Sequence, residues 1–224
     1  MATPSWQHPR GNTNATLSLV PVDLVICVAT ELEGALLRPH VPVLVTGVGA
    51  VNASCALTRF LEREGALAVI VCGIAGAYPR AFEDLGTGGV VCAESECYGD
   101  LGAFDAEGGF LDMEALGFPL IAAGPVYNEL PMQIFPAPRR ARFVTMNTCT
   151  GSDESARILE ARTGGAVESM EGAAIAHVAA LYGIACGEIR GISNRAGDRD
   201  RNGWRVKEAA VAAQQALLTW LCNR

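Results

Sequence analysis

Apolar segments of strand length alternate along the chain with segments in which apolar residues recur every three or four positions. Runs such as "VDLVICVA" and "LAVIVCGIAG" have no polar face, which is typical of strands covered on both sides of a parallel sheet. The stretches between them have the spacing of amphipathic helices. The alternation therefore predicts an α/β fold of three layers, αβα, around a mixed but mostly parallel central sheet.

The elements that this pattern predicts extend over nearly the whole chain. The segment 165–183 is expected to be a short strand that runs into a long Ala-rich helix, and a short helix is expected to begin in "ELEGALLRPH". The remaining expected strands are 22–29, 41–49, 67–76, 87–99, 140–150 and 184–194, and the remaining expected helices are 50–65, 152–164 and 204–224.

Length and charge set broad limits on domain number and partners. A chain of 224 residues, 50% of them hydrophobic, suits one sizeable domain, which we expect at 20–224. Residues 1–19 are polar and lack the apolar core of a signal peptide, so we expect a flexible extension there. The formal net charge of −7 opposes nucleic-acid binding, and no apolar run approaches the roughly 20 residues of a membrane-spanning helix. We therefore expect neither partner.

The eight cysteines contain no C-x-x-C pair, and most lie inside apolar runs such as "LVICVA". Buried, reduced thiols of a cytoplasmic protein explain this placement better than disulfides or a zinc site.

The loops that follow the strands are the expected binding region, because ligands of such sheets bind outside the carboxyl ends of the strands. "TGVGAVN" has Asn52 where a dinucleotide-binding loop has its third glycine, so a tight turn is the better interpretation. Gly73 and Gly76 would let a ligand approach the end of their strand, or would ease helix packing. The segment 117–140, with five prolines, is expected to be irregular and could act as a lid.

Three acidic residues also follow strands: Glu31 and Glu33 after the first strand, and Glu171 at the start of a helix. An acid at a helix N-terminus is often only a favourable charge–dipole interaction. Together with Asn194, which ends the last strand in "ISN", they form a candidate site.

Five motifs occur here in the order seen in the nucleoside phosphorylase/nucleosidase superfamily, over roughly residues 22–221. The chain resembles most the hydrolytic branch, which includes methylthioadenosine/S-adenosylhomocysteine nucleosidases and futalosine hydrolases. "ECYGDLGAF" and "SNRAGDRDRNGW" look closer to the futalosine hydrolases. The motifs are "VATELEGALL", "TGVGAVNASCAL", "VCGIAGAY", "ESMEGAAIAHVA" and "IRGISN".

The resemblance implies a role for particular residues. Glu33 matches the general base that deprotonates the attacking water, Glu171 the acid that grips the ribosyl hydroxyls, and Asn194 the purine contact. Backbone groups near Cys149 and Thr150 would align with the purine edge. Further substrate-binding residues implied are Gly73, Ile74, Ala75, Gly76, Thr150, Ser169, Met170 and Ser193. Cleavage of an N-glycosidic bond by these groups requires no metal or organic cofactor.

Water is the expected acceptor, because the early loop offers Glu31 and Glu33, and a carboxylate would repel phosphate. Asn194 favours a 6-oxopurine such as hypoxanthine. An ionised Asp would set acceptor against acceptor at a 6-oxo group, whereas the Asn amide donates. Asn also serves adenine by geometry, so an adenosine-type nucleosidase, a purine nucleoside phosphorylase and a non-catalytic nucleoside-binding protein stay as alternatives.

The run after Asn194 would serve the benzoate end of futalosine. Arg195, Arg199 and Arg201 are candidate carboxylate partners, although ion pairs with Asp198 and Asp200 also explain them. Aromatic residues that could stack on the ring are Tyr98, Phe104 and Trp204. His177 is expected to be a core or interface histidine. The Ala-rich helix and the resemblance favour a homo-oligomer, with a dimer first.

Overall fold

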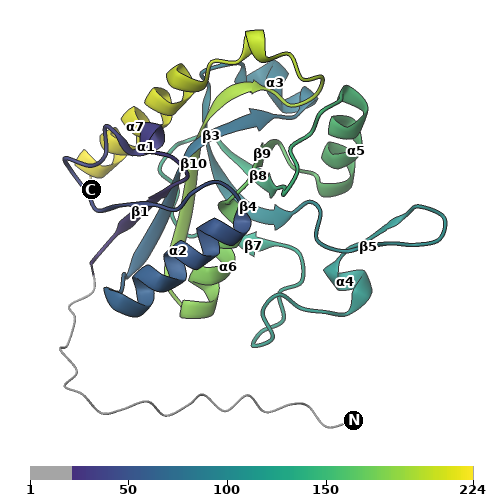
Figure 1. Ribbon diagram of the computed structural model, residues 1–224, viewed down its shortest axis with the longest axis horizontal. Helices are drawn as coiled ribbons and strands as arrows, with labels where there is room; N and C mark the ends of the chain where they lie inside the picture. Colours follow the sequence, from purple (N-terminus) through teal and green to yellow (C-terminus); the bar gives the residue numbers. More distant parts are fainter. Residues whose placement is uncertain (1–21, 224) are drawn as a thin grey trace.

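The computed structural model describes residues 22–223, so the extension expected at 1–19 lies outside the described residues. Its centre is a parallel pair of long strands, β3 (Ala68–Ala77) and β10 (Ala185–Arg195). β3 also pairs with β1 (Val25–Val28), which continues the sheet to β2 (Val43–Val45). These strands carry the apolar runs of the sequence, and Figure 1 shows the helices packed around them.

The sheet closes on itself within the described residues. From β10 the pairing continues to β4 (Val90–Tyr98), β8 (Arg140–Thr145) and β9 (Val167–Ser169), and β9 returns to β3. The large sheet contains five parallel and three antiparallel pairings. The expected mixed, mostly parallel sheet is therefore confirmed, whereas its closure into a ring was not predicted.

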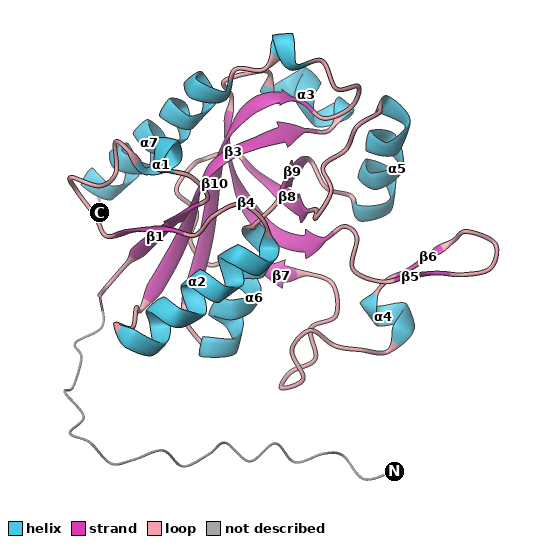
Figure 2. Ribbon diagram, in the orientation of Figure 1, coloured by secondary structure: helices cyan, strands magenta, loops and turns pink. Residues whose placement is uncertain are grey.

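Helices cover both faces of the β1–β3 region, because successive side chains of a strand point to opposite faces. Val25 and Cys27 pack with α2 (Ala50–Arg63) and α6 (Gly172–Tyr182). Ile26 and Val28 pack with α7 (Val206–Cys222) on the other side. Figure 2 shows these layers, and they confirm the three-layer α/β class.

Several short elements escaped the sequence prediction because each is shorter than the hydrophobic pattern needed to detect it. The helix expected after residue 30 is a single turn, α1 (Glu31–Gly34). The elements that the sequence did not predict are α3 (Pro79–Leu85), the hairpin of β5 (Ala103–Phe104) and β6 (Phe110–Leu111), α4 (Met113–Leu116), β7 (Leu130–Pro131) and a 3₁₀ turn at Arg201–Gly203. The helix expected at 152–164 is confirmed as α5 (Asp153–Thr163).

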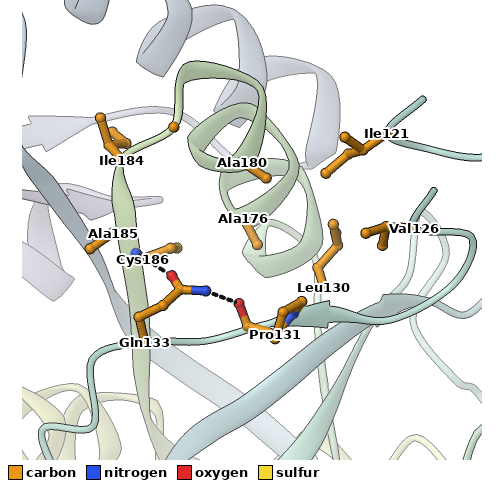
Figure 3. A pocket seen from close by; sticks show the side chains of 11 residues that line it. Ile121, Val126, Leu130, Pro131, Gln133, Ala176, Ala180, Ile184, Ala185 and Cys186 are labelled. Carbon is orange, nitrogen blue, oxygen red and sulfur yellow. Dashed lines mark hydrogen bonds between the residues drawn. The ribbon is translucent and has the colours of Figure 1, made fainter. Parts of the chain in front are cut away.

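The segment 117–140 lies against the amino-terminal end of β10. Its apolar side chains form a pocket of about 390 Å³ with α6, shown in Figure 3. Gln133 accepts a hydrogen bond from the Cys186 amide (2.9 Å) and donates one to the Pro131 carbonyl (2.7 Å). The Leu120 carbonyl lies 2.9 Å from Nε2 of His177, which places that histidine in a packing role. A larger cavity lies at the carboxyl end of β10, and no residue of 117–140 lines it. The interpretation of this segment as a lid therefore finds no support.

All eight cysteines lie among the described residues and are free thiols; five are buried, and Cys55 and Cys222 are exposed. Over residues 22–223, no helix combines the length and apolar character needed to cross a bilayer.

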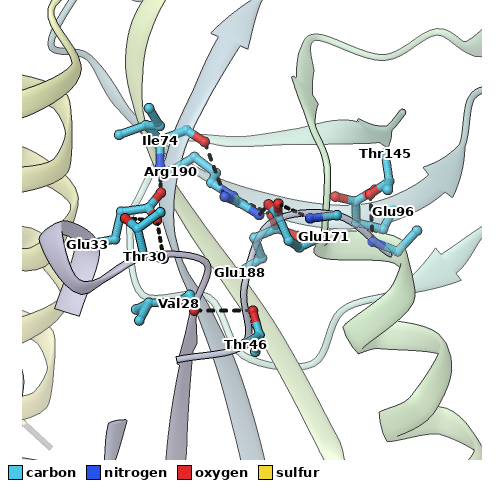
Figure 4. Close-up of polar contacts among 12 residues, drawn as sticks. Val28, Thr30, Glu33, Thr46, Ile74, Glu96, Thr145, Glu171, Glu188 and Arg190 are labelled. Atoms are coloured by element: carbon cyan, nitrogen blue, oxygen red, sulfur yellow. Dashed lines mark hydrogen bonds and ion pairs between the residues drawn. The ribbon is translucent and has the colours of Figure 1, made fainter. Parts of the chain in front are cut away.

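A pair of buried carboxyl groups lies inside the strand ring. Glu188 accepts a hydrogen bond from Nε of Arg190 (2.7 Å), and Glu96 accepts one from Thr145 (3.1 Å), as Figure 4 shows. The second oxygen of each glutamate has no partner among the described residues, and a Cβ on Gly172 would clash with both oxygens. Burial and the neighbouring Glu188 raise the pKa of Glu96 well above its usual value. We infer that the two groups share a proton.

Replacing Glu96 with Gln tests this proton. Because the folded-state pKa is raised, the folded protein binds more protons than the unfolded chain above about pH 4.5, the usual value, and wild-type stability falls as the pH rises from there. Glu96→Gln keeps an acceptor for Thr145 and offers an N–H to Glu188 without titrating. We expect its free energy of unfolding, measured in urea across pH, to fall less steeply than that of the wild type.

The exposed Glu83→Gln variant is the matched control and should keep the wild-type pH profile. If Glu96→Gln and wild type also shared one profile, no proton would be held between Glu96 and Glu188.

Candidate active site

A cavity of about 670 Å³ opens at the carboxyl ends of β3, β9 and β10. The start of α1, the loop after β8 and the start of α7 complete its wall. Most of the residues named from the sequence meet there: Glu33, Ile74, Ala75, Gly76, Thr150, Ser169, Met170, Glu171, Ser193, Asn194 and Trp204.

Glu33 is held in this wall by its place in α1. It is the N3 residue of a capping box, and its Oε2 accepts hydrogen bonds from the Thr30 amide (2.9 Å) and hydroxyl (2.8 Å). Its Oε1 accepts a third from the Ile74 amide (3.0 Å). The residue is only 4% exposed, whereas the Glu31 side chain is 73% exposed and pairs with Arg38 at the surface. The structure thus separates the two acids of "TELE".

Gly73 lies next to the Glu33 carboxylate but does not itself line the cavity. A Cβ at this position would lie 2.6 Å from Oε1 of Glu33 and 2.6 Å from Nη1 of Arg190. Glycine at 73 is therefore the residue that lets the carboxylate and the guanidinium approach each other.

Glu171 is the N-cap residue of α6, and its carboxylate contacts the guanidinium of Arg190. Its Oε1 accepts from the Gly49 amide (3.0 Å) and its Oε2 from Nη2 of Arg190 (3.3 Å). Burial alone would lower the pKa of Arg190, but the nearby carboxylates of Glu188, Glu171 and Glu33 outweigh it and raise that pKa. Arg190, 1% exposed, therefore stays charged among these carboxylates, and Figure 4 shows its contacts with Glu188 and Glu171.

Asn194 is the second-last residue of β10 and lines the cavity beside Gly76, where a Cβ would lie 3.2 Å from Nδ2 of Asn194. Its Oδ1 lies 2.7 Å from the Ser193 hydroxyl, which is also 3.1 Å from the Ala75 carbonyl. Its Nδ2 donates to the Arg195 carbonyl (3.0 Å), and the second N–H of the amide is left for a ligand.

The far wall holds Cys149, Thr150 and Ser169. Burial raises the pKa of Cys149 to about 11, so its thiol stays neutral near pH 7 and is a poor nucleophile. The Ser169 hydroxyl is buried in the cavity wall and has no partner among the described residues. It is therefore a donor still available to a ligand.

Three residues predicted to bind the substrate lie elsewhere. Arg195 makes a two-pronged ion pair with Asp153 at the start of α5, and this pair lowers the pKa of Asp153 to about 2. Tyr98 lies beyond α6, with its hydroxyl 3.4 Å from Nδ1 of His177. Phe104 projects on the β5–β6 hairpin, 72% exposed. The direction of a side chain at a strand end depends on partners that are distant in the sequence. The spacing of residues within a motif does not reveal these partners.

Arg199, one candidate of the "RAGDRDR" run, does line the cavity, with its guanidinium carbon 5.2 Å from the Trp204 ring centroid. Two further wall residues, Arg190 and Glu168, were not predicted from the sequence. A signal existed for Arg190, because a charge inside the apolar run "IACGEIRGIS", two residues from Glu188, lies on the same strand face as that acid.

The arrangement sets two buried carboxylates at one end of the cavity and amide and hydroxyl donors at the other. A carboxylate that accepts only from neutral donors can orient and deprotonate a water, and a second one can accept from vicinal hydroxyls. The donors suit a polar heterocycle. This is the chemistry needed to cleave a nucleoside at its glycosidic bond.

Comparisons with known proteins agree with this chemistry. The profile described as "Phosphorylase superfamily" matches residues 29–221. The futalosine hydrolase of Thermus thermophilus is 35% identical over 184 residues, 78% of each chain. That of Acidothermus cellulolyticus is 37% identical over 209 residues, 85% of this chain and 83% of the relative.

Solved structures show the same fold. A Helicobacter pylori 5'-methylthioadenosine/S-adenosyl homocysteine nucleosidase superposes with a TM-score of 0.75 at 16% identity, covering 91% of this chain and 99% of the other. A futalosine hydrolase of the same organism gives 0.74, also at 16%, covering 91% and 98%. From the profile match, the fold and the relatives, the chain belongs to the phosphorylase superfamily.

Proposed function

We propose that this chain is an N-glycosyl hydrolase that cleaves futalosine into hypoxanthine and dehypoxanthine futalosine, a step of menaquinone biosynthesis. The observation that carries the proposal is a buried, triply hydrogen-bonded Glu33 at the cavity wall of a chain 35–37% identical to proteins named futalosine hydrolase.

Glu33 activates the water. Its carboxylate accepts hydrogen bonds from Thr30 and Ile74, which hold it in the cavity wall, where it can orient a water and accept its proton at the sugar end of the cavity. Glu171 accepts hydrogen bonds from the ribosyl hydroxyls. Both carboxylates place negative charge near the sugar, where the oxocarbenium-like transition state develops positive charge.

Asn194 serves the leaving base. The free N–H of its amide donates to N7 or O6 of hypoxanthine as negative charge builds on the ring. The Ser193 hydroxyl and the Arg195 carbonyl fix the amide orientation, so the donor is aimed before the substrate arrives.

Water is the acceptor. A phosphate approaching the sugar would meet the carboxylates of Glu33 and Glu171, and Arg190 beneath them is already bonded to Glu188, Glu171 and the Ile74 carbonyl. The benzoate end of the substrate extends toward Arg199 and Trp204. Of the arginines considered as carboxylate partners, Arg199 takes this role, because Arg195 is paired with Asp153.

The protein acts in the cytoplasm as a homo-oligomer, with a dimer as the first expectation. Its buried free thiols suit a reducing compartment, and exposed apolar side chains such as Val51 on α2 and Leu181 on α6 suit a contact between copies.

A competition panel of futalosine, aminodeoxyfutalosine, methylthioadenosine and inosine tests the proposed substrate. Hypoxanthine release from futalosine, followed chromatographically with and without phosphate, should be fastest and independent of phosphate. Rapid adenine release from methylthioadenosine, with none of hypoxanthine from futalosine, would overturn the proposal.

Replacing Glu33 with Gln should lower kcat for futalosine by about 10²–10⁴-fold, the usual contribution of a general base. The neighbouring Glu31→Gln removes an exposed carboxylate and should keep the wild-type rate. Steady-state kinetics of both variants would contradict the assignment if Glu33→Gln stayed within twofold of Glu31→Gln.

Replacing Asn194 with Asp should shift the ratio of kcat/KM for futalosine and aminodeoxyfutalosine toward the 6-amino substrate by roughly 3–10-fold, because one hydrogen bond is exchanged for a repulsion. Parallel assays of both substrates measure the ratio. An unchanged ratio would show that Asn194 does not choose the base.

A further inference from the structure

Glu168 is a cavity-lining carboxylate that no step of the proposed reaction uses. It belongs to β9, is 6% exposed, and forms part of the cavity wall. Carboxylates are seldom buried without a role for their charge.

The strand register sets Glu168 opposite Asn194. Gly76 of β3 pairs with Glu168 on one side and with Asn194 on the other. Paired residues of neighbouring strands point to the same face, so both side chains flank the bare backbone of Gly76. The flanking strands lie roughly 10 Å apart, about twice the normal spacing between strands. A flat ring lying over Gly76 would have one edge near the amide and the other near the carboxylate.

Glu168 is held by three donors. Its Oε1 accepts from the Thr150 amide (2.9 Å), and its Oε2 accepts from the Thr150 hydroxyl and from the Tyr78 hydroxyl (3.2 Å). Burial and the adjacent Glu168 raise the pKa of Tyr78, so its hydroxyl keeps the proton that it donates. None of the ion pairs among the described side chains involves Glu168.

One acceptor position remains on this carboxylate, because the two oxygens together offer about four lone-pair sites and only three are used. The free site belongs to Oε1, since Oε2 already accepts twice. Glu168 thus offers a ligand an acceptor and no donor.

We propose that Glu168 accepts the N1–H of the 6-oxopurine and is a specificity-determining residue for the base. The inference rests on the proposed function and names how its base is recognised. A 6-oxopurine carries hydrogen on N1, whereas adenine carries a lone pair there, which would face the carboxylate as acceptor against acceptor. Asn194 then donates to N7 or O6 on one side of the ring, and Glu168 accepts the N1–H on the other side.

Glu168→Met tests the proposal, because methionine has similar length and no strong acceptor. The kcat/KM for futalosine should fall at least tenfold while that for aminodeoxyfutalosine falls less than threefold. Glu168→Gln keeps one acceptor oxygen and should recover part of the futalosine rate. Glu64→Met, an exposed replacement at the end of α2, should leave both values unchanged. Equal losses for both substrates would show that Glu168 only supports the wall, and would overturn the proposal.

A second measurement needs no variant. Wild-type protein should bind hypoxanthine at least tenfold more tightly than 1-methylhypoxanthine, which lacks the N1 hydrogen, in titration calorimetry. Equal affinities would also overturn the role of Glu168. The wild-type substrate panel decides the proposed function separately: hypoxanthine release with an unchanged base ratio in Glu168→Met would sink only the present inference.

Discussion

The site depends on the contacts of one buried group, the guanidinium of Arg190. It lies between Glu188, Glu171 and the Ile74 carbonyl, next to Glu33, in a position open only because residue 73 is glycine. A buried ion group is costly unless each member is paired and hydrogen-bonded, and removing one partner leaves the others uncompensated. Burial and the neighbouring Glu188 raise the pKa of Glu96, and a proton kept on Glu96 lowers the negative charge that Arg190 must balance. Arg190 thereby links the interior of the strand ring with the cavity wall, because its partners include Glu188 on one side and Glu171 on the other.

The cavity has two unlike ends. At the end of the cavity proposed for the sugar, backbone amides of Ile74 and Gly49 donate hydrogen bonds to Glu33 and Glu171, and Glu171 also pairs with Arg190. Such an end suits a developing cation and opposes an incoming phosphate. At the end proposed for the base, the Asn194 amide and the Glu168 carboxylate would orient the base through directional hydrogen bonds. The same fold could therefore serve other nucleosides through changes at the base end alone, while the sugar end stays as it is.

Local patterns carried much of the fold and part of the site. The alternating apolar runs predicted the strands and layers. The place of the acids after strands, together with the family resemblance, pointed to Glu33 and Glu171, which do line the cavity. The ring closure was out of reach, because β10 pairs with both β3 and β4 through contacts across much of the chain. Arg195 was misplaced for the same reason: its partner, Asp153, lies 42 residues earlier. Glu168 gave no signal in "AVESM", since its donors come from two distant loops.

Isotope labelling tests the central claim, that water and not phosphate attacks the sugar carbon. Purified protein would turn over futalosine in ¹⁸O-labelled water that also contains phosphate, with mass spectrometry of both products. The account predicts free hypoxanthine and one ¹⁸O atom on the anomeric carbon of the remaining sugar. A sugar 1-phosphate without the label, or an unlabelled sugar product, would contradict it.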